Sequence, residues 1–153
     1  MPSDFELANM FDDTKWGELF SRTDVETIAR HLSLHTYEPG DQIFSEGDRE
    51  NYMAFIVQGH IEILKESGDL TESILVTLGP RTHFGEMAFI DDEPRSASAT
   101  ARDQVTLLVL SKEHFENILA TDPPLGITML RNIARLISQR LRSTTGKLVY
   151  LRV

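Results

Sequence analysis

The spacing of hydrophobic residues divides the chain into three stretches. Over residues 1–36 the apolar positions recur with a helical period. Thr23 followed by Glu26 forms a capping box, in which each side chain accepts a hydrogen bond from a backbone N–H at the start of a helix. One stripe of that helix would carry Val25, Ile28, Ala29 and Leu32. The pattern therefore predicts N-terminal helices over residues 1–36.

Between residues 37 and 110 the period shortens to that of β-strands. Ile61 and Ile63 alternate with polar neighbours, as does the stretch through Phe55 and Val57. Residues 74–78 and 105–110 form short apolar runs, and glycines separate the runs. Many short strands joined by glycine turns are typical of an all-β sandwich or barrel. The polar residues 66–72 are expected to form a hairpin tip.

The helical period returns after Ser111, which we expect to cap a helix. A short helix should end at Asp122, because two prolines follow it. The apolar positions of the long final helix are spaced alternately by three and four residues, which is a heptad seam. The seam consists of Ile127, Leu130, Ala134, Ile137, Leu141, Thr144, Leu148 and Leu151. A second stripe runs through Met129, Ile133 and Leu136.

Two apolar stripes on one helix predict two packing surfaces. We expect one stripe to pack on the body of its own chain and the other on a partner helix, which gives a parallel homodimer through the C-terminal helix. The alternative is a single helix that lies entirely on its own domain. Gly146 interrupts the seam, and since a glycine inside a helix costs about 1 kcal/mol relative to alanine, the helix is expected to bend or end there.

Residues 84–101, FGEMAFIDDEPRSASATA, carry the candidate chemistry. Gly85 has no side chain and lets the backbone approach a ligand closely. Glu86, Met87 and Ala88 could begin a short helix whose backbone N–H groups point at an anion. The acidic residues 91–93 are expected to form a solvated turn.

Further along this segment, Arg95 can give a phosphate or carboxylate two parallel hydrogen bonds. Ser96 adds a hydroxyl and a backbone donor, and the small residues from Ala97 to Ala101 are expected to leave room above the sheet. Such a site suits an anion with a nearby hydrogen-bond donor for Glu86, as in a ribose-phosphate. The alternative is an internal Glu86–Arg95 salt bridge that joins two strands.

The sequence FGEMA followed six residues later by PRSASATA resembles the phosphate-binding cassette of the cyclic-nucleotide-binding domain. This domain occurs in bacterial catabolite activator proteins, regulatory subunits of cAMP-dependent kinase and nucleotide-gated channels. Residues 38–64 resemble the early strands of the same β-roll. The resemblance covers nearly the whole chain. It implies a mainly β fold with flanking helices, a double-stranded β-helix or jelly-roll-like β-roll over 37–110, with C-terminal helices over 111–153 and one domain over 1–153.

The resemblance also implies roles for the cassette residues. Glu86 would accept a hydrogen bond from the ribose 2′-hydroxyl, and Arg95 would pair with the cyclic phosphate. Backbone donors around Gly85, Met87, Ala88 and Ser96 would complete the anion pocket. The expected ligand is cAMP, with cGMP as the alternative. Closure of the cassette on the ligand would then move or order the final helix.

A possible contact with the base lies in the final helix. Residues 140–148, RLRSTTGKL, resemble the stretch of catabolite activators in which two adjacent hydroxyl residues touch the adenine. Thr144 and Thr145 occupy the matching pair. Thr144 is also a seam position, so the alternative is a threonine that only fills a heptad site.

Charge and composition narrow the class of protein. Residues up to Asp122 include 9 basic and 24 acidic side chains, and the rest of the chain has 6 basic and none acidic, which gives −15 and +6. An acidic body repels DNA phosphates, so direct DNA binding is not expected. No apolar run approaches the roughly 20 residues that span a bilayer. Without cysteines or a secretory signal, the chain is expected in the cytoplasm.

An enzyme is the first competing interpretation. The barrel of a cupin-like metalloenzyme needs clustered metal ligands. His31 and His35 would lie one helical turn apart on the N-terminal helix, with no third ligand in sequence. His83 adjoins the cassette and could touch a ligand, although a histidine at a strand end is commonly just half-buried. Since no nucleophile–base pattern is present either, we expect no catalysis, no catalytic cofactor and no metal.

A dimerisation module with a vestigial pocket is the second competing interpretation. The presence of both Glu86 and Arg95 argues against it. Catabolite activators continue into a helix-turn-helix reader and kinase subunits carry inhibitory segments, and neither is found before Val153. We therefore expect either a stand-alone sensor, with a downstream effector protein as a possible partner, or a fragment that lacks its output portion.

Overall fold

The computed structural model of the chain describes residues 1–66 and 72–151, apart from the side chains of residues 66, 72, 73, 75, 88, 89 and 144–151. The expected hairpin tip at 66–72 lies largely outside the described residues. The chain forms two compact units, Met1–His114 and Phe115–Val153. The expectation of a single domain over 1–153 stays a prediction.

The N-terminal helices begin at serine caps. These are α1 (Asp4–Asp12), capped by Ser3, and α2 (Arg22–Ala29), capped by Ser21. The short 3₁₀ helix η1 (Gly17–Leu19) lies between them and has no side-chain cap. The Ser21 hydroxyl oxygen accepts a hydrogen bond of 3.2 Å from the backbone N–H of Asp24 and so caps α2. The predicted capping box at Thr23 is therefore wrong, because α2 starts one residue before Thr23 and Ser21 satisfies its first turn.

A strand occupies the end of the predicted helical stretch. β1 (Leu32–Tyr37) pairs with β8 (Val105–Ser111) along its whole length, from Leu32 opposite Leu110 to Tyr37 opposite Val105. The prediction of helix up to residue 36 is therefore wrong after Ala29. The segment Leu-Ser-Leu-His alternates apolar and polar residues, and pairing with β8 satisfies its backbone as a strand.

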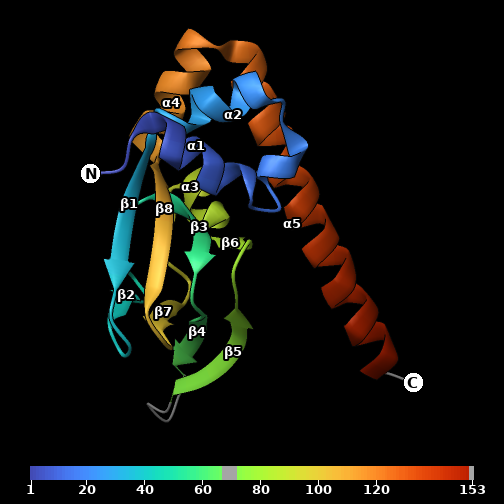
Figure 1. Cartoon of the computed structure of the whole chain (residues 1–153). Coiled ribbons are helices and arrows are strands. Elements are labelled where there is room, and N and C mark those ends of the chain that lie inside the picture. The colour runs from blue at the N-terminus through green and yellow to red at the C-terminus, as the bar shows by residue number, and fades with distance from the viewer. Residues whose placement is uncertain (67–71, 152–153) are drawn as a thin grey trace. The chain divides into compact units, whose positions relative to one another are not determined.

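Two antiparallel four-stranded sheets form the body of the Met1–His114 unit (Figure 1). The first has the order β1, β8, β3 (Tyr52–Gln58) and β6 (His83–Phe84). The second has the order β2 (Gln42–Phe44), β7 (Ser98–Ala101), β4 (Ile61–Glu66) and β5 (Glu72–Leu78). The predicted mainly β fold with flanking helices, a jelly-roll-like β-roll, is confirmed.

Both sheets contribute to one apolar core. It consists of Phe44, Tyr52, Ala54, Ile56, Ile61, Phe84, Ala99, Ala101, Val105, Leu107 and Val109. Phe55 points to the opposite face of β3, where its ring lies 5.0 Å from that of Phe11 in α1 and 5.5 Å from that of Trp16. β3 is thus buried on both faces, so the predicted alternation around Phe55 is wrong. The alanines of β7 fill this core rather than leaving room above the sheet.

The chain after β8 is helical, as predicted. The Ser111 hydroxyl accepts a hydrogen bond of 3.1 Å from the backbone N–H of His114, which confirms the cap of α4 (Lys112–Thr121). α5 runs over Pro123–Leu151, so the helix does not end at Gly146. Among the described side chains of the predicted seam, Ile127, Ala134 and Leu141 are exposed.

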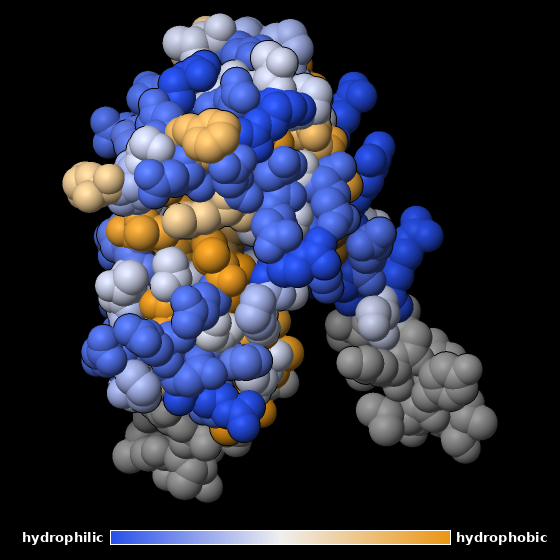
Figure 2. All heavy atoms as spheres, in the orientation of Figure 1, coloured by the Kyte–Doolittle hydropathy of each residue, from blue (hydrophilic) through white to orange (hydrophobic). Residues whose placement is uncertain are grey.

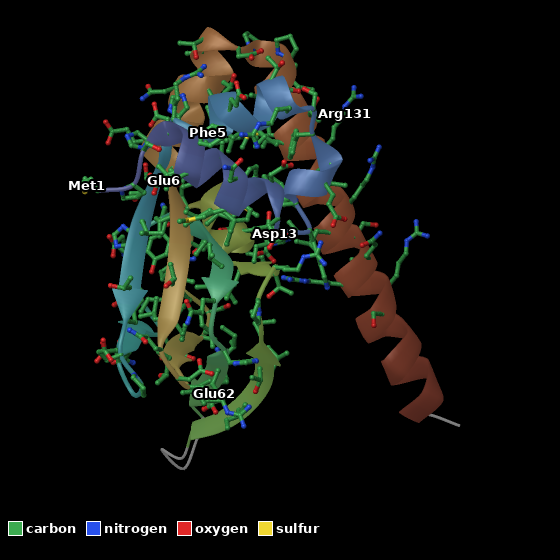
Figure 3. All side chains as sticks on the ribbon, in the orientation of Figure 1. Met1, Phe5, Glu6, Asp13, Glu62 and Arg131 are labelled. Carbon is green, nitrogen blue, oxygen red and sulfur yellow. The ribbon has the colours of Figure 1, made fainter. Side chains whose placement is uncertain are left out.

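The surface of the Met1–His114 unit is mostly hydrophilic on the face shown in Figure 2, with apolar side chains visible just below α1. Acidic side chains are spread over this unit, and Glu6, Asp13 and Glu62 in Figure 3 come from α1, its C-terminal end and β4. Among the described residues, no helix is long and apolar enough to cross a membrane.

Candidate ligand-binding site

The cassette starts at a glycine in the left-handed conformation. Gly85, with φ of 88°, directly precedes α3 (Glu86–Asp91). A Cβ atom added to Gly85 would lie 2.7 Å from the Tyr52 carbonyl oxygen and 2.8 Å from Arg95 Nη1. Both distances are shorter than van der Waals contact. Position 85 therefore requires glycine for two reasons, the left-handed φ and the close approach of these two atoms. The close neighbour of Gly85 is the Arg95 guanidinium.

Arg95 is buried, with only 4% of its surface exposed. Its Nη1 donates a hydrogen bond of 3.2 Å to the Gly85 carbonyl, and its Nη2 donates one of 2.8 Å to the Tyr52 carbonyl. The guanidinium carbon lies 4.4 Å from the centre of the Phe44 ring and 4.6 Å from that of Tyr52. Two aromatic rings and two carbonyls therefore fix the plane of the guanidinium.

The Arg95 Nε atom is buried and has no hydrogen-bond partner within the part of the chain that the structure describes. A buried donor without a partner costs about 1–3 kcal/mol, and more when it is charged. An anion that reached this edge of the guanidinium would satisfy that donor. The fork of donors on an arginine matches the geometry of a phosphate or a carboxylate.

The charge of Arg95 is maintained in an acidic setting. Burial lowers the pKa of Arg95, and the negative charges of Glu50, Asp48 and Glu86 act in the opposite direction. A guanidinium stays protonated in proteins, so the site contains a permanent buried cation. Burial also raises the pKa of Tyr52, which therefore faces Arg95 as a neutral phenol.

Glu86 is also buried, at 1% exposed. Its Oε2 lies 3.6 Å from Nδ1 of His83, whose side chain is 10% exposed. Both hydrogen bonds described for the Arg95 side chain go to carbonyl oxygens and neither goes to Glu86. Arg95 is oriented by these carbonyls and by the Phe44 and Tyr52 rings, and the charge of Glu86 acts on it.

The backbone around Arg95 is clamped by the loop after β2. The Arg95 N–H donates to the Asp48 carbonyl at 2.8 Å, and the Gly47 N–H donates to the Arg95 carbonyl at 2.8 Å. Lys65 Nζ donates to the Ser96 carbonyl at 2.6 Å. The backbone of Arg95 is therefore held by the loop after β2, and the next residue is held by Lys65 of β4.

The acidic residues 91–93 are exposed, as expected, but Asp91 is the last residue of α3 rather than part of a turn, and Asp92 is bound. Asp92, with φ of 60°, accepts a hydrogen bond of 3.2 Å from Asn51 Nδ2 and forms an ion pair with Lys112. Asp92 therefore holds the cassette loop to the ends of β3 and β8, rather than lying free in solvent. Asp91 and Glu93 are exposed.

The remaining predicted contacts are placed as follows. Met87 is 54% exposed in the first turn of α3, and Ser96 is exposed. Ala88 is part of α3, but its side chain lies outside the described residues. Thr144 and Thr145 belong to α5, in the other unit, and their side chains also lie outside the description. Their role at a base therefore stays a prediction.

Sequence reasoning missed the aromatic pair that holds Arg95. Phe44 ends β2 and Tyr52 begins β3, eight positions apart in sequence, and both belong to the core cluster. The strand alternation of each places its ring inside the roll, but only the fold brings the two rings to one guanidinium. A sequence signal did exist, since Phe44 and Tyr52 flank the polar segment 45–51 at the ends of two strands.

The structure provides no support for the histidine pair on a helix. His35 lies in β1, and His31 precedes that strand, so the two are not one helical turn apart. Within the described residues, no group of three histidine, cysteine, aspartate or glutamate side chains could hold a metal ion. A separate hollow of about 430 Å³ beside α1 contains none of the cassette residues.

The comparisons with known proteins assign the chain to a family. The family model for the cyclic nucleotide-binding domain matches residues 34–122, more than half of the chain. A CRP-like cAMP-activated global transcriptional regulator of Mycobacterium tuberculosis is 28% identical over 127 residues, which cover 83% of this chain and 55% of the regulator. A cAMP-dependent protein kinase regulatory subunit of Debaryomyces hansenii is 31% identical over 107 residues, which cover 70% of this chain and 23% of the subunit.

A solved structure has the same fold. The crystal structure of a cyclic nucleotide-binding domain from Methylobacillus flagellatus superposes with a TM-score of 0.80 at 25% identity, covering 95% of this chain and 82% of that one. The jelly-roll-like roll is thus shared with a domain that binds cyclic nucleotides. The chain belongs to the cyclic-nucleotide-binding domain family. It spans about half the length, or less, of the two curated relatives named above.

Proposed function

We propose that this chain is a cAMP sensor in which Arg95 binds the cyclic phosphate and Glu86 binds the ribose. The observation that carries the proposal is the buried Arg95 guanidinium, fixed by Phe44 and Tyr52, with its Nε donor unpartnered among the described residues. A cyclic nucleotide has one phosphate charge and one free 2′-hydroxyl. One cation and one carboxylate in the same buried site are the matching groups.

The other contacts follow from the cassette. Backbone donors around Gly85, Met87, Ala88 and Ser96 complete the anion pocket. Thr144 and Thr145 on α5 contact the base, which favours cAMP, while Ser96 beside the arginine leaves cGMP as the alternative. The names of the two curated relatives, one cAMP-activated and one cAMP-dependent, support the choice of cAMP.

The signal passes to the C-terminal helix. The cassette belongs to the Met1–His114 unit and Thr144 to the Phe115–Val153 unit, so a ligand that touches both would favour one arrangement of the two units over others. The ligand can shift that equilibrium only by its difference in affinity for the arrangements. The chain forms a homodimer through the heptad seam on α5. The change in the arrangement of the units is passed through this dimer to a downstream effector protein.

The chain itself acts as a regulator rather than an enzyme, and it does not bind DNA directly or insert into a membrane. The relatives named above are a transcriptional regulator and a kinase regulatory subunit. The charge of −15 up to Asp122 disfavours contact with DNA phosphates. A cytoplasmic location stays a prediction from the sequence.

Calorimetric titration of the purified chain tests the ligand and the arginine together. We expect cAMP to bind more tightly than cGMP, with AMP, which lacks the cyclic phosphate, much weaker. Arg95→Ala should lose about 2–5 kcal/mol of binding, or roughly 30- to 4,000-fold in affinity, because it removes one partner of a buried charged contact. Arg102→Ala removes an exposed arginine near the end of β7 and should bind as the wild type does.

Because Arg95 also supports the fold, Arg95→Lys is the second variant: it keeps the charge and loses the planar fork. Circular dichroism verifies that each variant is folded. If Arg95→Ala binds within a few-fold of wild type, the assignment of the phosphate to Arg95 is wrong. If the wild type binds none of the nucleotides, the chain is a dimerisation module with a vestigial pocket.

A further inference from the structure

His83 occupies a buried position directly beside the proposed ribose-binding carboxylate. It lies in β6, paired with Phe55 of β3, and three residues before Glu86. Nine-tenths of its side chain is buried, and its Nδ1 lies 3.6 Å from Glu86 Oε2. That distance is slightly longer than a hydrogen bond, and a shift of a few tenths of an ångström would make one.

The ring nitrogen that faces Glu86 has no other hydrogen-bond partner among the residues described. His83 Nδ1 is buried and unpartnered there. The ring is flanked by Trp16, at 5.9 Å between centroids, and by Phe55, at 6.0 Å. Neither aromatic neighbour carries a charge or accepts a strong hydrogen bond from Nδ1. Glu86 is therefore the polar group with which His83 Nδ1 interacts.

The charged groups near His83 leave Glu86 as its main electrostatic partner. α3 contributes Glu86, which also interacts electrostatically with Arg95. On the turn before β6, the Arg81 side chain is engaged by Glu18 and by the Asp13 carbonyl. Phe55 on β3 and Trp16 beside η1 are uncharged.

We propose that His83 is a positioning residue that holds Glu86 Oε2 and, when protonated, increases the affinity for the anionic ligand. This role rests on the proposed function. By holding Oε2, Nδ1 would fix the orientation in which the Glu86 carboxylate meets the 2′-hydroxyl of the ribose. A protonated imidazole also compensates the charge of Glu86, which otherwise repels the phosphate that Arg95 receives.

The coupling between proton and ligand has a definite sign. If protonation of His83 favours the anionic ligand, then the ligand favours protonation of His83 by the same factor. Affinity should therefore rise as pH falls. Binding at neutral pH should take up a fraction of a proton from the buffer.

Calorimetric titration with cAMP between pH 5.5 and 8.5, in two buffers of different ionisation enthalpy, tests the role of His83. We expect the affinity of the wild type to rise about three- to tenfold toward low pH, since one pKa unit of coupling corresponds to tenfold, with proton uptake on binding. His83→Gln can still donate a hydrogen bond to Glu86 but cannot titrate, so its profile should be flat. His60→Gln removes a half-exposed histidine paired with Asp103 and should keep the wild-type profile.

Proton NMR of the His83 ring in the wild type is the second measurement, and it needs no variant. The midpoint of its titration should move to higher pH when cAMP is added. Binding with a flat wild-type profile, or a His83→Gln variant that keeps the slope, overturns the role of His83 alone. Absence of cAMP binding at every pH overturns the proposed function and, with it, this role.

Discussion

Replacing Gly85 with alanine tests how the backbone of the cassette positions Arg95. Gly85 and Gly40 have the same left-handed φ of 88°. A Cβ atom at Gly85 would lie 2.7 Å from the Tyr52 carbonyl oxygen and 2.8 Å from Arg95 Nη1, whereas one at Gly40 would meet no heavy atom within 4 Å. The pair of variants therefore separates backbone strain, which both share, from the close approach of Arg95, which only Gly85 makes.

The expected losses of stability follow from two contributions, the backbone strain and the steric clash of the added Cβ atom. Left-handed strain costs about 1–2 kcal/mol for a non-glycine residue, and it applies to both variants. Forcing an extra carbon into a well-packed site adds about 1–3 kcal/mol, and it applies to Gly85→Ala. The two variants should thus differ by about 1–3 kcal/mol in the free energy of unfolding, or roughly 2–12 °C in Tm for a protein of this size.

Urea unfolding and cAMP titration measure the two consequences separately. Gly85→Ala should be the less stable variant, and it should also bind cAMP at least tenfold more weakly, because the added carbon displaces the Arg95 fork. Gly40→Ala should lose stability from strain alone and keep its affinity. Equal losses of stability and equal affinities for the two variants would refute the reasoning that Gly85 admits the guanidinium.

Three further predictions concern stacking, pH dependence and the core. Phe44→Leu removes the ring 4.4 Å from the Arg95 guanidinium, so cAMP affinity measured by calorimetry should fall about 2- to 30-fold, and an unchanged affinity would mean that stacking does not orient the arginine. The hydrogen bond from His60 lowers the pKa of Asp103 in the folded protein. The contribution of this pair to the folding stability is therefore present above about pH 4, and it is lost as pH falls through the lowered pKa of Asp103. Asp103→Asn should therefore be less stable than wild type in urea at pH 7, and the difference should shrink as pH falls below about 4; a difference that stays constant with falling pH contradicts this. Leu107→Ala empties part of the core and should cost about 2–5 kcal/mol in the same assay, with a loss under 1 kcal/mol showing that the sheets are not packed there as described.

The sequence predicted the fold where a local pattern and the tertiary structure agree. Ser111 was expected to cap a helix and does so, and the prolines after Asp122 separate α4 from α5. The runs at 74–78 and 105–110 became β5 and β8. In each of these segments the local sequence preference and the tertiary structure favour the same element.

The prediction failed where tertiary pairing decides between two local patterns. Leu32 continues the apolar stripe of α2 and also begins the alternation of β1, and the ladder with β8 decides in favour of the strand. Phe55 and Ile56 are adjacent and both buried, because α1 and Trp16 cover the outer face of β3. Alternation cannot reveal a strand that is covered on both sides.

The charged residues of the candidate site could be predicted from the sequence. The groups that orient these residues could not. Glu86 and Arg95 were identified from a motif, and both are buried in one cassette. The two rings that flank Arg95, and the contact of Asp92 with Lys112, join segments far apart in sequence, which only the fold brings together.

Equilibrium dialysis of the purified chain against labelled cAMP tests the central claim most directly. The account predicts saturable binding of one nucleotide per chain, displaced by unlabelled cAMP and not by AMP at the same concentration, and lost when Arg95 is replaced by lysine. Saturable binding that survives the Arg95→Lys substitution, or no binding by the folded wild type, would contradict it.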